Sequence, residues 1–177
     1  MTLLPKALLL VAALGLAACN NPDRYGSGGT DGAGGTGSGG GSGIDTTGLG
    51  DPNDPASIAY FNAQVGDRVL FAVDQSTLSP EGRNILIGQA EWLKRNADYA
   101  IIIEGHADEQ GTREYNLALG ARRAASVQDF LMANGVAANR MRTISYGKER
   151  PIEICSDEAC YAKNRRAVTV LSMGAGA

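Results

Sequence analysis

Glycine is distributed so unevenly along this 177-residue chain that it limits where a globular fold can form. Between Gly26 and Gly43 the sequence is mostly Gly, Ser and Thr. A segment with so few apolar side chains cannot offset the entropy that it would lose on ordering. We therefore expect residues 19–55 to form a flexible tether, or a spacer without further meaning. Residues 56–177, about 120 residues, are expected to form one domain with its own core.

The first 18 residues have the pattern of a secretion signal. Lys6 is their only basic residue, and an unbroken apolar run of eight residues, Ala7 to Leu14, follows it. This run is much shorter than the ~20 residues that span a bilayer, and it suits the core of a signal peptide. Small residues then precede Cys19, an arrangement that resembles the bacterial lipobox. The pattern predicts a lipoprotein signal peptide over residues 1–18 and a lipidated Cys19; the alternative is an ordinary signal peptide cut near Ala18.

After Pro55, apolar residues recur with the spacings of helices and strands. Helices are predicted at 56–65, 80–96 and 113–133, and strands at 68–73, 100–104, 142–146 and 167–171. The strand at 100–104 shows no clean alternation, so we expect it to be central and buried on both faces. The apolar stripe of the last helix is predicted to consist of Leu117, Ala121, Ala124, Val127 and Leu131. The order β-α-β-α-β-β predicts an α/β (α+β) fold, a mixed sheet with helices on one face.

Charged residues gather where the 100–104 strand ends and the next helix begins. Asp108 and Glu109 lie in a polar loop, and Arg122 and Arg123 lie in the following helix. Ligands commonly bind at loops that follow strand ends. A carboxylate can take an ammonium and an arginine fork can take a carboxylate, so such a set can bind a zwitterion. The alternative is that these charges form a solvated surface.

Composition and the remaining reactive residues narrow the possible functions. The net charge of −3 comes without a dominant basic patch, which argues against nucleic acid as a partner. His106 is the only histidine, so we predict no metal and no cofactor, and we expect this residue to be hydrogen-bonded at a strand end.

No Ser or Cys nucleophile motif is present. A cell-wall hydrolase remains the alternative function, and its carboxylate pair would be two of Asp74, Glu104, Asp108 and Glu109.

Two further cysteines, Cys155 and Cys160, are close enough in sequence to form a local disulfide. A secreted protein meets an oxidising environment, so we predict that they are paired. Two free thiols or a metal-binding pair are the alternatives.

Several linked motifs point to a known family. Their residues are 105–112, 115–116 and 119–124, then Tyr146–Pro151 and Asn164–Val168. Together they are very similar to the OmpA-like peptidoglycan-binding domain, most closely to its peptidoglycan-associated lipoprotein branch, over about Arg68 to Leu171. Linked motifs in the right order are far more specific than one short pattern.

This resemblance implies a binding protein, not an enzyme. The family binds the meso-diaminopimelate of the peptidoglycan stem peptide, whose free end carries an amine and a carboxylate on one carbon. By motif position, Asp108 takes the ammonium and Arg123 pairs with the carboxylate. The other implied pocket residues are Asp74, Thr112, Asn116 and Leu119. Gln110 stands where close relatives often have Arg, which removes one charged contact.

The resemblance also implies a location and partners. A lipidated Cys19 followed by Asn20 favours an outer-membrane anchor with the domain in the periplasm. The family joins the outer membrane to peptidoglycan, contacts TolB and other Tol proteins, and acts when the envelope constricts during cell division. A purely structural interaction module is a third possibility.

Overall fold

The computed structural model describes residues 49–154 and 156–173. The predicted signal peptide, Cys19, residues 20–48 of the tether and Cys155 lie outside the described residues. The elements, in chain order, are α1 (Ile58–Tyr60), the π-helical turn η1 (Phe61–Gly66), β1 (Arg68–Leu70), α2 (Pro80–Arg95), β2 (Tyr99–His106), α3 (Arg113–Ala133), the 3-10 turn η2 (Ala138–Arg140), β3 (Met141–Gly147), α4 (Glu158–Asn164) and β4 (Arg166–Met173).

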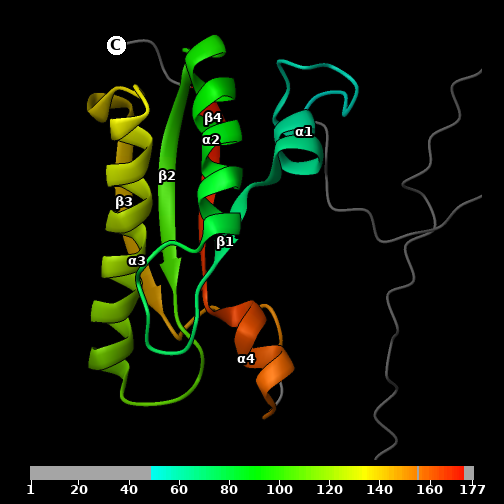
Figure 1. Cartoon of the computed structure of the whole chain (residues 1–177). Helices are drawn as coiled ribbons and strands as arrows, with labels where there is room; N and C mark the ends of the chain where they lie inside the picture. Colours follow the sequence, from blue (N-terminus) through cyan, green and yellow to red (C-terminus); the bar gives the residue numbers. More distant parts are fainter. Residues whose placement is uncertain (1–48, 155, 174–177) are drawn as a thin grey trace, which may run out of the picture. The chain divides into compact units, whose positions relative to one another are not determined.

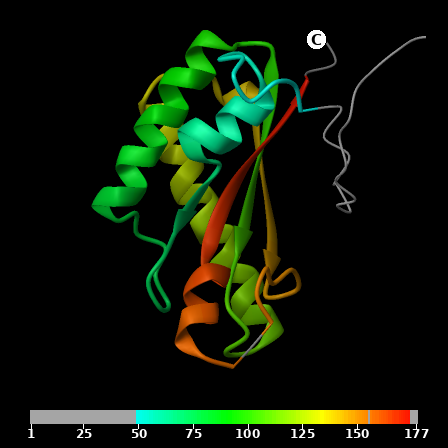
Figure 2. The same cartoon turned by 90° about the vertical axis from the view of Figure 1, so that its right-hand side faces the viewer.

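The four strands form one sheet in the order β1-β4-β2-β3. β4 is antiparallel to both of its neighbours, whereas β2 and β3 are parallel. α2 and α3 pack against one face of this sheet, and α4 lies at the end where β2 stops (Figures 1 and 2). The predicted fold, a mixed sheet with helices on one face, is confirmed.

The central strand β2 is buried on one face only. Ile101 and Ile103 point at the helices and are 1% and 0% exposed, while Ile102 and Glu104 between them are half-buried. Our expectation of burial on both faces is therefore wrong. Successive residues of β2 alternate between buried and half-buried although three of them are isoleucines, because no helix of the described residues packs on the second face.

The long helix α2 begins where the sequence predicts. The Ser79 hydroxyl accepts a hydrogen bond from the Gly82 amide at 3.0 Å, and Pro80 is the first helical residue. At the other end of α2, Trp92 is 1% exposed and donates its indole N–H to the Pro55 carbonyl at 2.7 Å. This contact ties residues that the sequence assigns to the tether to the core of the domain.

The second long helix, α3, buries a different face from the one predicted over its first half. Leu117 is 46% exposed, whereas Gly120 and Arg123 are buried; from Ala124 onward the predicted stripe is correct. Gly120 crosses β2 so closely that a Cβ on Gly105 would lie 1.8 Å from the Gly120 carbonyl oxygen. The close crossing requires glycine, and this is why an apolar stripe could not continue through the first half of α3.

Two segments depart from the predicted pattern near the end of the sheet that carries the charged loop. β1 stops at Leu70, three residues earlier than predicted, and the chain then turns through Asp74, whose φ of 57° is left-handed. The seven residues of α4 were not predicted, because so short a helix shows no clear periodicity. On α4, Cys160 is disulfide-bonded. Its predicted partner, Cys155, is not described, so the pairing stays a prediction.

Candidate binding site

A hollow of about 230 Å³ lies between the loop after β1, the loop after β2 and the first turns of α3. Its lining residues are Val73, Asp74, Asp108, Gln110, Gly111, Tyr115, Asn116 and Leu119. Four of the predicted site residues are thus brought together: Asp74, Asp108, Asn116 and Leu119. The other two, Thr112 and Arg123, are not part of the lining.

Asp108 is the more deeply held of the two carboxylates. It is 8% exposed, its Oδ2 lies 3.1 Å from Arg165 Nη1, and its Oδ1 accepts a hydrogen bond from the Gln110 amide at 3.2 Å. Arg165 also donates to Glu158 on α4. Burial lowers the pKa of Arg165, but its hydrogen bonds with Glu158 and Asp108 outweigh this effect and raise the pKa above its ordinary value. A carboxylate paired with a permanent cation is held in one orientation at the rim of the pocket.

Arg123 stands behind the pocket and is fully buried. Its guanidinium donates to three backbone carbonyls, those of Gln75 at 2.8 Å, His106 at 2.7 Å and Ala72 at 3.2 Å. Burial lowers its pKa to about 10, and the nearby Asp108 and Asp74 carboxylates oppose this change. Arg123 therefore stays charged at neutral pH, and it joins the loop after β1 to the end of β2.

Thr112 and Tyr115 shape the entrance from the first turn of α3. The Thr112 hydroxyl caps the helix by accepting from the Tyr115 amide at 3.2 Å, so its role in the structure is to fix where α3 begins. The Tyr115 hydroxyl donates to the Asp74 carboxylate and thereby bridges the helix and the loop after β1. The sequence did not single out Tyr115, although it falls within the motif.

The two other motifs of the resemblance converge on the loop that carries Asp108. Lys148 Nζ donates to the carbonyls of Glu109 at 3.3 Å and Gly111 at 2.6 Å. Asn164, fully buried, donates its side-chain amide to the Glu109 carboxylate at 2.7 Å. Together with Arg165 from the same motif, these side chains hold the loop. Sequence reasoning recognised the motifs but gave Lys148, Asn164 and Arg165 no role.

His106, immediately before this loop, is 2% exposed and stacks on Tyr146 with ring centroids 5.5 Å apart. Neither ring nitrogen has a hydrogen-bond partner among the described residues, and Nε2 lies 3.6 Å from Glu104 Oε2, beyond hydrogen-bonding range. The expectation of a hydrogen-bonded histidine is therefore wrong. Burial, reinforced by Arg166 and Arg150, lowers the pKa of His106 to about 4, so the ring is neutral at pH 7. The described part of the chain contains no cluster of three side chains suited to a metal.

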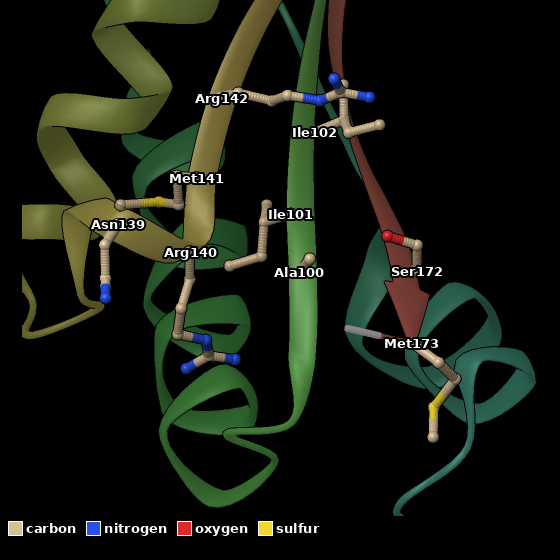
Figure 3. A pocket seen from close by; sticks show the side chains of 9 residues that line it. All are labelled: Ala100, Ile101, Ile102, Asn139, Arg140, Met141, Arg142, Ser172 and Met173. Atoms are coloured by element: carbon tan, nitrogen blue, oxygen red, sulfur yellow. The ribbon is translucent and has the colours of Figure 1, made fainter. Parts of the chain in front are cut away.

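A second hollow, of about 330 Å³, lies at the opposite end of the sheet, near the starts of β2 and β3 (Figure 3). It is lined by Ala100, Ile101, Ile102, Asn139, Arg140, Met141, Arg142, Ser172 and Met173. No carboxylate is among these residues, and the Arg140 guanidinium is occupied by the carbonyls of Tyr99, Leu93 and Asn96. This hollow lacks the pair of opposite charges that a zwitterion requires.

Comparison with known proteins decides the family. Residues 70–165 match the OmpA family. The chain belongs to the OmpA family. Within it, a peptidoglycan-associated lipoprotein of Mesorhizobium japonicum is 46% identical over 97% of this chain and 94% of its own length. One from Brucella melitensis is 57% identical over 69% of this chain and 72% of its own.

The solved structures agree with this assignment. The crystal structure of the peptidoglycan-associated lipoprotein from Burkholderia pseudomallei is 39% identical, with a TM-score of 0.61, over 70% of this chain and 98% of that one. The predicted resemblance to this branch of the OmpA family is confirmed. No helix within residues 49–154 and 156–173 is long and apolar enough to cross a bilayer.

Proposed function

We propose that this chain binds peptidoglycan without a covalent bond, and that the pocket beside Asp108 takes the free end of meso-diaminopimelate. One observation carries the proposal: two carboxylates, Asp74 and Asp108, line a hollow of about 230 Å³ that is backed by the buried cation Arg123. The relatives are named peptidoglycan-associated lipoproteins, which supports the first part of the proposal, association with peptidoglycan.

The hydrogen-bonding capacity of these groups suits an amino acid's two charged ends. An ionised carboxylate has about four acceptor positions, and Asp108 uses two of them for Arg165 and the Gln110 amide. A ligand ammonium takes the remaining positions. Arg123 has five donors, of which three bind backbone carbonyls. Its positive charge favours the ligand carboxylate from behind the lining, while Asn116 and Leu119 line the pocket and Thr112 fixes the start of α3 beside it.

The wider role follows from the predicted N-terminus. We propose that lipid on Cys19 anchors the chain in the outer membrane and that the tether lets the domain reach the wall from the periplasm. TolB and other Tol proteins are the proposed protein partners, with TolB competing for the pocket surface, in support of envelope constriction during division. A Cys19→Ser chain that still fractionates with the outer membrane would remove the anchor from this proposal.

The chain is a binding protein of its family and not a wall hydrolase. Three of the four candidate carboxylates already have partners: Asp74 with Tyr115, Asp108 with Arg165 and Glu109 with Asn164. The fourth, Glu104, lies on the sheet beside His106. Incubation of the protein with purified sacculi is expected to release no soluble wall fragments.

The central test is a pull-down of the chain with purified sacculi. Asp108→Asn keeps the shape of the side chain and removes its charge, so bound protein should fall by at least about tenfold. Asp129→Asn, at an exposed position on α3, makes the same charge change and should bind as the wild type does. Equal binding by the two variants would reject the site.

A further inference from the structure

The pocket wall formed by Gln110 and Gly111 belongs to neither a helix nor a strand. Within the described part of the chain, no backbone–backbone hydrogen bond reaches Glu109, Gln110 or Gly111. Their carbonyls accept from side chains instead. Asn116 Nδ2 donates to Gln110 at 2.7 Å, and Lys148 Nζ donates to the two flanking carbonyls. The shape of this wall therefore depends on side-chain donors.

Lys148 reaches the loop from a rigid base. The preceding Gly147 has a φ of 52°, and a Cβ there would lie 2.9 Å from the Leu117 amide nitrogen on α3. The Gly147 carbonyl accepts from the Ala107 amide at 2.8 Å, and the Glu149 amide donates to the Tyr146 carbonyl at 3.0 Å. The fixed backbone on both sides places the Cα of Lys148, and the two hydrogen bonds to the loop carbonyls hold the ammonium at the end of its flexible side chain.

The two carbonyls that Lys148 holds determine where the loop amides point. In a trans peptide the C=O and the following N–H point in opposite directions. Holding the Glu109 carbonyl on one side therefore aims the Gln110 amide to the other side, where it donates to Asp108 Oδ1 at 3.2 Å. Holding the Gly111 carbonyl fixes the next peptide unit at the start of α3 in the same way.

We infer that Lys148 is a positioning residue for ligand binding. It does not line the pocket, but it fixes the Glu109–Gln110 and Gly111–Thr112 peptide units and, through the Gln110 amide, the orientation of the Asp108 carboxylate. This inference rests on the proposed function, because it assigns Lys148 to the same pocket. It predicts that the ammonium of Lys148 affects affinity without touching the ligand.

The test measures binding of a stem peptide ending in meso-diaminopimelate by calorimetry, with the full chain purified in detergent. Lys148→Met keeps the aliphatic stem and removes the donor, so affinity should fall about tenfold. The midpoint of thermal unfolding should move by no more than about 3 °C, since the donor is half-exposed. Lys148→Arg, which again offers donors to both carbonyls, should recover most of the affinity. Hydrogen exchange at the Gln110 amide should quicken in Lys148→Met and slow again in Lys148→Arg.

Lys163→Met is the matched control. Lys163 also carries one charge, but it pairs with the Glu153 side chain at 2.9 Å on the exposed surface. It should bind the peptide like the wild type, and an equal loss in both variants would reduce the effect to net charge and overturn the inference. So would wild-type affinity in Lys148→Met, or a loss that Lys148→Arg does not recover. If Asp108→Asn also binds like the wild type, the proposed function itself fails.

Discussion

Replacing Arg123 by Met tests whether one buried guanidinium holds the two loops that form the pocket. The substitution keeps much of the stem volume but leaves the carbonyls of Gln75, His106 and Ala72 without their donor. A hydrogen bond from a charged donor contributes about 1.5–3 kcal/mol net, and a buried acceptor without a partner costs about 1–3 kcal/mol. No longer burying a charge offsets part of this loss. We expect the free energy of unfolding to fall by about 4 kcal/mol.

Urea unfolding followed by circular dichroism measures this loss. With a slope of about 1–3 kcal/mol per molar urea, the midpoint should fall by roughly 2 M. Arg122→Met is the control, because Arg122 is the neighbouring residue on the exposed side of α3 and its guanidinium lies over the Tyr115 ring, 5.9 Å from the ring centroid. That variant should stay within about 0.5 kcal/mol of the wild type. A loss below about 1 kcal/mol in Arg123→Met would refute the reasoning.

Three other predictions follow from the core, the buried histidine and the cysteines. Gly120→Ala places a Cβ 2.4 Å from Ser145 Oγ and 2.8 Å from the Gly105 carbonyl oxygen, so the unfolding free energy should fall by about 1–3 kcal/mol in a urea titration; an unchanged midpoint would contradict the close crossing. His106 has a folded pKa of about 4, below its unfolded value of about 6.5. The unfolded chain therefore binds the proton first, and stability should fall as pH drops from about 6.5 to 4, by on the order of 3 kcal/mol. His106→Gln should flatten that slope, and a slope equal to that of the wild type would contradict it. Non-reducing peptide mapping should find Cys155 and Cys160 in one linked fragment, about 2 Da lighter than the reduced pair, and separate fragments would reject the pairing.

The helices and strands could be predicted wherever their local patterns were strong. The Ser79-Pro80 start of α2 and the β-branched centre of β2 are local signals, and both elements formed where expected. The stripe of α3 failed at Leu117 because its buried face there serves a tight crossing at Gly120 instead of an apolar core. Periodicity reports apolar burial, and it cannot report a face buried for other reasons.

The residues of the candidate site were predictable in part because the family motif keeps several of them close in sequence. Asp108 and Asn116 lie eight positions apart and line one pocket with Asp74, which is distant in the chain. The sequence could not predict which groups the positively charged side chains bind. Whether the Arg123 guanidinium meets a ligand or a backbone carbonyl depends on tertiary packing, and the same holds for Lys148.

The chain enters the domain at the opposite end of the sheet from the pocket. The Trp92 and Tyr99 side chains donate to the carbonyls of Pro55 and Ala56 beside the first residue of β2, whereas the pocket follows its last residue. The two ends of β2 lie at opposite ends of the sheet (Figure 1). A mechanical load applied between the two ends would run along the strands. Because ladder hydrogen bonds lie across the strands, a load in this direction bears on many of them at once instead of on one bond at a time.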